Sequence, residues 1–314
     1  ILYDALAELG LGDQPEDAAI ERKPADHVTL HSVDGFRSFI DDPRLFAEIT
    51  VQHALSDIYA MGGRPVSALA MVTLPFGAED KNRALLVQLL SGVLSVLKEK
   101  DIRLAGGHTT EGAELGLGVA VNGLAREEAL LWKAGLKPGD CLILTKPLGT
   151  GALLAADMQY RAKGTWMESA ISIMRQSNAE AVACLHQYGV RACTDVTGFG
   201  FAGHLMEMLK ASGVQAVIRL DDLPAMDGAL EVINRWRIRS TLHDQNRRSI
   251  VGLQQRPHEN VELLFDPQTS GGLLASIPAD QAERCRQALI QAGYDRAALV
   301  GEVRPGAPAI HLEG

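Results

Sequence analysis

Apolar positions along the chain repeat with two different periods, and the two periods alternate from one segment to the next. Residues 27–33 alternate between polar and apolar and predict a strand that ends at Asp34. Asp42 and Pro43 are typical of a helix start, because aspartate caps free backbone N–H groups and proline fits the first helical turn. We expect this helix to end near Met61.

The rest of the pattern predicts a series of strands and helices whose order favours α/β or α+β layers. The expected strands lie near residues 67–74, 102–105, 115–124, 141–147, 214–220, 261–265 and 272–277. The expected helices lie near residues 1–10, 80–100, 148–161, 166–188, 199–211 and 279–293. Turn signals between residues 126 and 138 divide the chain into predicted domains 1–130 and 131–314.

Composition narrows the classes of function. The chain has 314 residues, of which 46% are hydrophobic, so it can bury a sizeable core. A net charge of −9 argues against nucleic acid or an anionic membrane as the main partner. It does not argue against a nucleotide, because a divalent metal reverses the local sign. No apolar run reaches the roughly 18 residues of a membrane span. Four dispersed cysteines predict reduced thiols in a cytoplasmic protein.

Acidic residues at strand ends and in turns are the first candidates for chemistry. The four of interest are Asp17, Asp34, Asp57 and Asp195. Magnesium prefers oxygen ligands, usually one or two carboxylates per ion together with phosphate oxygens and water. Carboxylates that converge from separate segments could hold several ions along a triphosphate. Taken singly, each of them is more readily explained as a helix cap or a solvated turn residue than as a metal ligand.

Glycine-rich segments are the second set of candidates. They lie at residues 106–109, 149–151, 198–200 and 266–272. Glycine lets backbone N–H groups approach a phosphate, and a following helix adds a favourable dipole. None of them matches the P-loop or the dinucleotide-binding pattern, so tight turns remain the alternative. The predicted nucleotide-binding residues among them are Gly106, Gly107, His108, Thr109, Gly198 and Gly200.

Three long motifs in order resemble the selenophosphate synthetases. They are HALSDIYAMGGRP at residues 53–65, CTDVTGFGFAGHLMEM at residues 193–208 and LFDPQTSGGLLASIP at residues 264–278. AGGHTTE, at residues 105–111, lies between the first motif and the second. The wider superfamily includes aminoimidazole ribonucleotide synthetase, thiamine-monophosphate kinase and a hydrogenase maturation protein. The TDVTGFG run distinguishes this sequence from those relatives.

The resemblance implies two α/β domains of the aminoimidazole ribonucleotide synthetase type. It also implies a homodimer in which the N-terminal sheets form a barrel. The implied reaction converts ATP, selenide and water to selenophosphate, AMP and orthophosphate, with Mg²⁺ and often K⁺. By motif, the metal ligands would be Asp17, Asp34, Asp57 and Asp195, and His53 would lie close to the nucleotide.

The sequence departs from the family pattern in two respects. The family opens with a glycine-rich segment that carries a reactive Cys and an essential Lys. We expect these residues upstream of Ile1, so no catalytic residue is assigned within the chain. His53 stands where the family more often has Asn, as in the variant fused behind a flavin-dependent oxidoreductase domain. Another ATP-using enzyme of the superfamily and a catalytically silent nucleotide-binding module remain the alternative functions.

Overall fold

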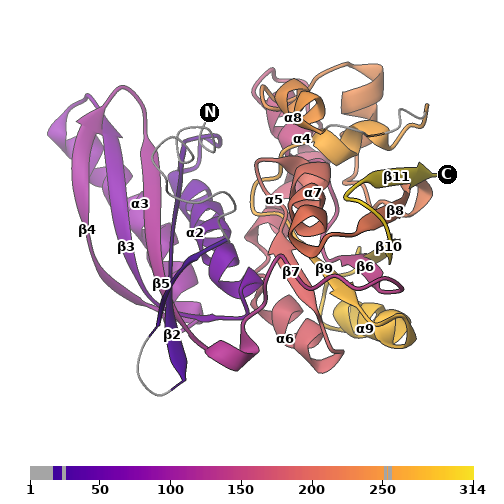
Figure 1. Cartoon of the computed structure of the whole chain (residues 1–314). Coiled ribbons are helices and arrows are strands. Elements are labelled where there is room, and N and C mark those ends of the chain that lie inside the picture. Colours follow the sequence, from indigo (N-terminus) through magenta and orange to yellow (C-terminus); the bar gives the residue numbers. More distant parts are fainter. Residues whose placement is uncertain (1–16, 23–25, 251–252, 254–256) are drawn as a thin grey trace, which may run out of the picture.

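The computed structural model describes residues 17–22, 26–250, 253 and 257–314, and it contains two β-sheets in two halves that lie side by side (Figure 1). The N-terminal sheet has the strand order β1-β2-β5-β3-β4, and the C-terminal sheet has the order β11-β8-β10-β6-β9-β7. Helices pack on both sheets, so the expected mixed α/β class is confirmed. The helix expected at residues 1–10 lies outside the described residues.

The N-terminal sheet is antiparallel except between β3 and β4, which run parallel. Its strands are β1 (Ala19–Arg22), β2 (His27–Arg37), β3 (Arg64–Pro75), β4 (Arg103–Gly112) and β5 (Gly116–Arg126). The short turn η1 (Glu127–Ala129) follows β5. Helices α2 (Pro43–Ala60) and α3 (Glu79–Glu99) pack together on one face of this sheet.

Helix α2 begins and ends where the sequence predicts. Asp42 Oδ1 accepts hydrogen bonds from the backbone N–H groups of Arg44 at 2.8 Å and Leu45 at 3.0 Å. Met61 is the C-cap, and Gly62 follows it with φ of +73°, a conformation that favours glycine. The predicted cap and helix end are therefore confirmed.

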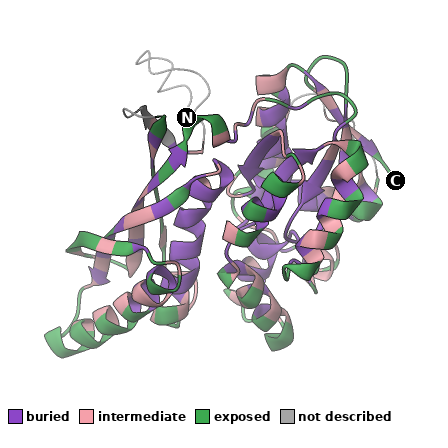
Figure 2. Cartoon of the chain, turned by 90° about the horizontal axis from the view of Figure 1, so that it is seen from below, coloured by how far each residue is buried: buried purple, intermediate pink, exposed green. Residues whose placement is uncertain are grey.

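Helix α2 lies between the two halves of the molecule (Figure 1). It contacts β2 and β5 on one side and the C-terminal elements β7, α5 and α6 on the other. Of its 18 residues, 14 are buried, so it is enclosed rather than half-exposed like a typical surface helix (Figure 2). Polar side chains on α2 are consequently held in the interior, between the two sheets.

The outer face of the N-terminal sheet, opposite α2 and α3, exposes large apolar side chains. Val33 on β2 is 71% exposed, Met71 on β3 is 57% exposed and Leu124 on β5 is 37% exposed. No element of the described part of the chain covers this outer face. An exposed apolar surface on a sheet is typical of an interface with another protein.

The C-terminal half contains the remaining elements. Its strands are β6 (Cys141–Leu144), β7 (Ala192–Asp195), β8 (Gln215–Arg219), β9 (Leu273–Ile277), β10 (Ala298–Arg304) and β11 (Ile310–Glu313). Its α-helices are α4 (Thr150–Asp157), α5 (Gly164–Arg175), α6 (Ala179–Gln187), α7 (Gly200–Ser212), α8 (His243–Ser249) and α9 (Ala279–Gln291). The short helices are η2 (Leu220–Asp222), η3 (Glu231–Arg235) and η4 (Val261–Phe265).

Two predicted elements of this half are wrong. The single helix expected over 166–188 is two helices, α5 and α6, with Asn178 in the break between them. The Asn178 side chain donates to Ser56 Oγ on α2 and to the carbonyl of Gly271, so the break serves a contact with the other half. The strand expected over 261–265 is the short helix η4, because an apolar run alone does not distinguish a strand from a buried turn.

The strand expected near residues 102–105 is too short, because β4 continues through the glycine-rich segment 106–109 to Gly112. Gly107 pairs with Ala70 of β3, and a side chain at Gly107 would come within 2.1 Å of the Ala70 carbonyl oxygen. Glycine is needed here for the close approach of two strands rather than for a turn.

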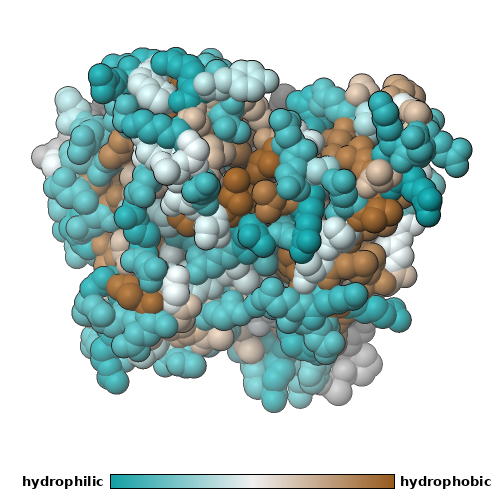
Figure 3. Space-filling view, turned by 180° about the vertical axis from the view of Figure 1, so that it is seen from behind, coloured by the Kyte–Doolittle hydropathy of each residue, from teal (hydrophilic) through white to brown (hydrophobic). Residues whose placement is uncertain are grey.

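No described helix is long and apolar enough to cross a membrane. The back of the molecule is covered mainly by hydrophilic side chains, with apolar ones gathered in separate patches (Figure 3).

The buried apolar residues form two clusters. One lies within the C-terminal half and extends to Ile49 on α2. The other combines residues of the N-terminal half, such as Leu30 and Phe46, with C-terminal residues such as Leu185 and Leu273. The second cluster therefore joins the two halves through shared hydrophobic contacts.

The cap of α2 gives a first testable prediction. Asp42→Ala should lower the free energy of unfolding by about 1 kcal/mol, because two backbone N–H groups lose their acceptor. Chemical denaturation measures the difference. Asp41→Ala, an exposed neighbour outside the cap, is the control and should leave stability nearly unchanged. Equal effects of the two substitutions would contradict the capping role.

Candidate functional site

Three of the predicted aspartates come together between the two halves. Asp17 precedes β1, Asp57 lies on α2 and Asp195 is the last residue of β7. Carboxylate oxygens of the three residues all lie within 4.8 Å of one another, a spacing that could hold a metal ion. These three residues are called the carboxylate cluster below. It forms because α2, enclosed between the sheets, packs against β7.

Burial and mutual repulsion disfavour negative charge in the carboxylate cluster. Burial, followed by the charge of Asp17, raises the pKa of Asp195 to about 8. Burial and the charges of Asp195 and Asp34 raise the pKa of Asp57 well above its usual value, although Ser32 donates a hydrogen bond to it. Asp195 Oδ2 is buried and has no hydrogen-bond partner within the described residues. A divalent cation would offset this repulsion and occupy that oxygen, so the residues fit a metal such as Mg²⁺.

The fourth predicted aspartate, Asp34, lies beside the cluster without belonging to it. It is two residues after Ser32 on β2, so both side chains point to the same face of the sheet, towards α2. Asp34 Oδ1 is 3.9 Å from Nε2 of His53. The structure therefore places Asp34 at the margin of the same site.

His53 connects the site to the C-terminal half. Its Nδ1 accepts the backbone N–H of Ser270 at 3.0 Å, so the neutral ring carries its proton on Nε2, which faces Asp34. Burial lowers the pKa of His53 and favours this neutral form. Ser270 has φ of +49°, an uncommon conformation for a residue other than glycine.

Lys146 holds the same turn and was missed by sequence reasoning. It is 1% exposed, and its Nζ donates to the carbonyls of Gln176 at 2.6 Å and Ser270 at 3.1 Å. Burial lowers its pKa to about 7, although Asp195 acts in the opposite direction. A lysine at the end of the apolar run CLILTK was the available signal, since lysine is rarely buried without a specific partner.

Asp17 is held by two residues that sequence reasoning also missed. Thr194 Oγ1 donates to its two carboxylate oxygens at 3.1 and 3.0 Å. Lys133 Nζ lies 2.8 Å from Asp17 Oδ1 and 3.0 Å from Glu207 Oε2. Burial alone would lower the pKa of Lys133, but the charges of Asp17 and Glu207 raise it above its usual value.

The predicted glycines Gly198 and Gly200 follow Asp195 closely in the chain, with Gly198 in the turn after β7 and Gly200 as the first residue of α7. Gly200 has φ of +69°, and a side chain there would approach the backbone of residues 264–266 to 3.0 Å. A side chain at Gly198 would meet no atom of the described residues within 4 Å, so this part of the turn is open on their side. The turn is therefore placed where it could approach a ligand of the cluster.

The other predicted nucleotide-binding residues lie away from the carboxylate cluster of the same chain. Gly106, Gly107, His108 and Thr109 lie on the edge strand β4, three strands from β2. His108 pairs with Met71 and therefore points to the exposed outer face, whereas Asp34 points towards α2. Three strand spacings correspond to roughly 14 Å.

The glycine turn at 149–151 is occupied by the protein itself. Asp266 Oδ2 accepts the N–H of Gly151 at 3.0 Å, and Gln268 Oε1 accepts the N–H groups of Gly149 at 3.0 Å and Thr150 at 3.2 Å. Burial raises the pKa of Asp266 to about 7. The loop at 266–268 thus caps α4, and the backbone donors there are already used.

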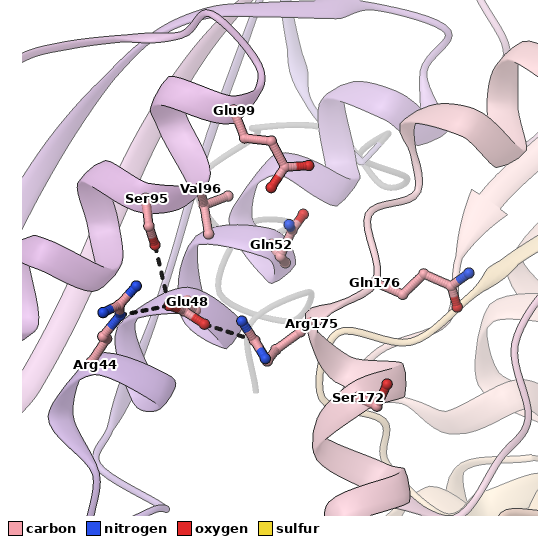
Figure 4. Close-up of a pocket in the computed structure, with 9 residues that line it drawn as sticks. All are labelled: Arg44, Glu48, Gln52, Ser95, Val96, Glu99, Ser172, Arg175 and Gln176. Atoms are coloured by element: carbon pink, nitrogen blue, oxygen red, sulfur yellow. Dashed lines mark hydrogen bonds and ion pairs between the residues drawn. The ribbon is translucent and has the colours of Figure 1, made fainter. Parts of the chain in front are cut away.

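A separate cavity of about 280 Å³ lies between α2, α3 and α5 (Figure 4). The buried carboxylate of Glu48 lies on its wall, 3.0 Å from Arg44 Nε and 2.7 Å from Arg175 Nε. Ser95 Oγ donates to the same carboxylate at 3.2 Å. Because Glu48 and Arg175 come from opposite halves, this ion pair also holds the halves together. None of the predicted site residues lines this cavity.

Family models match nearly the whole chain. The model described as the N-terminal domain of AIR synthase related proteins matches residues 15–125, and the model of the C-terminal domain matches residues 137–312.

Two proteins that are similar to this chain in sequence carry the same name. The "Selenide, water dikinase" of Pelobacter propionicus is 39% identical over 296 residues, which cover 93% of this chain and 84% of that protein. The "Selenide, water dikinase" of Myxococcus xanthus is 37% identical over 310 residues, which cover 95% of this chain and 85% of that protein.

Solved structures share the fold at low identity. Thiamine monophosphate kinase of Aquifex aeolicus has a TM-score of 0.73 and 17% identity, with coverage of 100% of this chain and 97% of that chain. The hydrogenase maturation protein HypE in complex with ATP has a TM-score of 0.69 and 14% identity, with coverage of 98% and 86%. The predicted two-domain fold is therefore confirmed.

The raised pKa values of the carboxylate cluster predict an unusual pH dependence. Without metal, folded Asp195 keeps its proton up to about pH 8, whereas the unfolded residue loses it near pH 4. The folded state therefore loses stability as pH rises between these values. Asp195→Asn should be more stable than the wild type by about 1 to 3 kcal/mol at pH 8, with a smaller difference at pH 5.

Denaturation in a chelator at the two pH values measures this effect. Asp280→Asn on the exposed start of α9 is the control and should show no pH-dependent gain. A wild type as stable as Asp195→Asn at pH 8 would contradict the repulsion between the carboxylates.

Proposed function

Because the chain belongs to the selenide, water dikinase family, we propose that it makes selenophosphate from ATP, selenide and water, releasing AMP and orthophosphate. The observation that carries the proposal is the carboxylate cluster between the two halves, in which one oxygen of Asp195 has no partner in the described part of the chain. Phosphoryl transfer depends mainly on positioning and on neutralising phosphate charge, and metal-binding carboxylates serve both purposes.

The four aspartates would hold the metal. Asp17, Asp57 and Asp195 would supply ligands to Mg²⁺ directly, and Asp34 would add a ligand from the margin of the cluster. Bound Mg²⁺ would neutralise charge on the triphosphate of ATP. K⁺ is proposed as a further cofactor on the family resemblance.

The nucleotide would lie next to the metal. The open turn at Gly198 would offer backbone contacts to phosphate oxygens, and His53 would present its Nε2–H towards the same space. Gly200 would shape this turn rather than donate to phosphate, because its N–H already donates to the Thr197 carbonyl at 3.0 Å. We assign ATP and metal binding, with dimerisation, to residues 1–130, and the supporting α/β domain to residues 131–314. Asp195, Gly198 and Gly200 would be the C-terminal contributions to the site.

The outer face of the N-terminal sheet is proposed to pair with a second copy of the chain. Val33, Met71 and Leu124 are exposed there, and the described elements leave this face uncovered. Burial of these side chains in a symmetric interface would remove apolar surface from water. The reaction is assigned to the cytoplasm, in keeping with four cysteines that form no disulfide in the structure.

Loss of one carboxylate should separate metal-dependent from metal-independent binding. Asp57→Asn should weaken ATP binding in the presence of Mg²⁺ by 10-fold or more, because one metal ligand loses its charge. Calorimetry with and without a chelator measures this. Asp80→Asn, exposed at the start of α3, is the control and should bind as the wild type does.

The reaction itself is tested by phosphorus NMR on the natural protein with any residues that precede Ile1. Selenophosphate, AMP and orthophosphate should form only when selenide is added, and Asp57→Asn should abolish all three. Equal ATP affinity of Asp57→Asn and the wild type in Mg²⁺ would remove Asp57 from the metal site. ATP consumption without selenide-dependent selenophosphate would overturn the proposed reaction.

A charge on the outer face should prevent pairing. Met71→Glu should convert a dimer of twice 33.7 kDa to a monomer, because a carboxylate would be buried in the apolar interface. Light scattering coupled to size exclusion measures the mass. Glu79→Gln on α3 is the control and should remain dimeric. A monomeric wild type would contradict the proposed dimer.

A further inference from the structure

Lys133 is a buried cation in direct contact with the carboxylate cluster. It is 8% exposed and lies in the segment that connects η1 with β6. Its Nζ is 2.8 Å from Asp17 Oδ1 and 3.0 Å from Glu207 Oε2. A lysine is seldom buried unless its charge is paired, and here two carboxylates pair it. The buried charge of Lys133 is therefore held directly against one member of the carboxylate cluster, Asp17.

Asp17 depends on side chains from the other half for its position. The residue lies outside a regular element, because β1 begins only at Ala19. Thr194 and Lys133 together contact both of its carboxylate oxygens. Asp57 and Asp195, by contrast, are fixed by α2 and β7. Asp17 is thus the member of the cluster whose geometry relies most on its hydrogen-bond partners.

Glu207 both anchors Lys133 and balances its charge. It lies on α7, 25% exposed at the side chain, and its ion pair with Lys133 leaves little net charge beside the cluster. His204, one turn earlier, accepts the backbone N–H of Thr197 at Nε2, so its neutral ring carries the proton on Nδ1. That Nδ1 faces Glu207 Oε2 at 3.9 Å. His204, the histidine of the TDVTGFGFAGH motif, therefore lies next to the series of contacts that runs from Glu207 through Lys133 to Asp17.

We propose that Lys133 is a positioning residue, anchored by Glu207, that sets the carboxylate of Asp17 for metal binding. The inference rests on the proposed metal site of the carboxylate cluster. Two effects of Lys133 on a bound cation have opposite signs. Its positive charge repels the cation, whereas its hydrogen bond fixes a ligand of that cation. Because Glu207 offsets the charge, the positioning effect should prevail.

Manganese binding to the whole chain decides between the two effects. Lys133→Met keeps the length of the side chain but removes the charge and the hydrogen bond. It should weaken binding of Mn²⁺, measured by electron paramagnetic resonance, by 10-fold or more. Glu207→Gln should weaken it in the same direction but less, because Lys133 loses an anchor. Lys137→Met, four residues away and exposed, should bind Mn²⁺ as the wild type does.

Asp195→Asn distinguishes failure of the inference from failure of the metal site. If Asp195→Asn weakens Mn²⁺ binding but Lys133→Met binds equally or more tightly, Lys133 acts only as a charge and the inference is wrong. If Asp195→Asn leaves Mn²⁺ binding unchanged, the proposed metal site fails and the inference fails with it. Thermal unfolding in a chelator shows whether Lys133→Met is folded. If it is not, wild-type Mn²⁺ affinity in Glu207→Gln would overturn the inference.

Discussion

Mutual repulsion among closely spaced, largely buried carboxylates is the constraint around which the polar groups of the site are arranged. Asp57 and Asp195 face each other between two sheets, with Asp17 beside them. Ionised carboxylates are costly to bury without compensation. Ser32 donates a hydrogen bond to Asp57 and Thr194 donates one to Asp17, but one oxygen of Asp195 has no hydrogen-bond partner among the described residues. A cation in the proposed metal site would complete this compensation.

Much of the fold follows from local signals in the sequence. The start of α2 was predictable because Asp42 and Pro43 act through contacts within one turn. Asp57 and Asp195 could be singled out because they lie in long motifs, and Asp17 and Asp34 because they stand in a turn and at a strand end. Local signals failed where a distant contact decides the structure. The glycines of β4 permit a close strand pair, and Asn178 breaks a helix in order to reach α2.

The contacts of the residues that support the site could not be predicted from the sequence, for a similar reason. Lys133 and Lys146 lie in segments whose pattern only marks a turn or a strand end. Their partners are far away in the chain: Glu207 for Lys133, and Ser270 for Lys146. No periodicity relates residues at such separations. Only the packing of α2 between the halves shows that both lysines border the same site.

The hydrophobic cluster shared between the halves has a consequence for how the protein unfolds. Leu30 and Phe46 pack in one cluster with Leu185 and Leu273, so separating the halves exposes apolar surface on both. Such a protein should lose its structure in a single cooperative transition, although its architecture suggests two independent units. The carboxylate cluster would then come apart only with global unfolding. Although its residues come from two halves of one chain, the site should therefore be as stable as the folded protein itself.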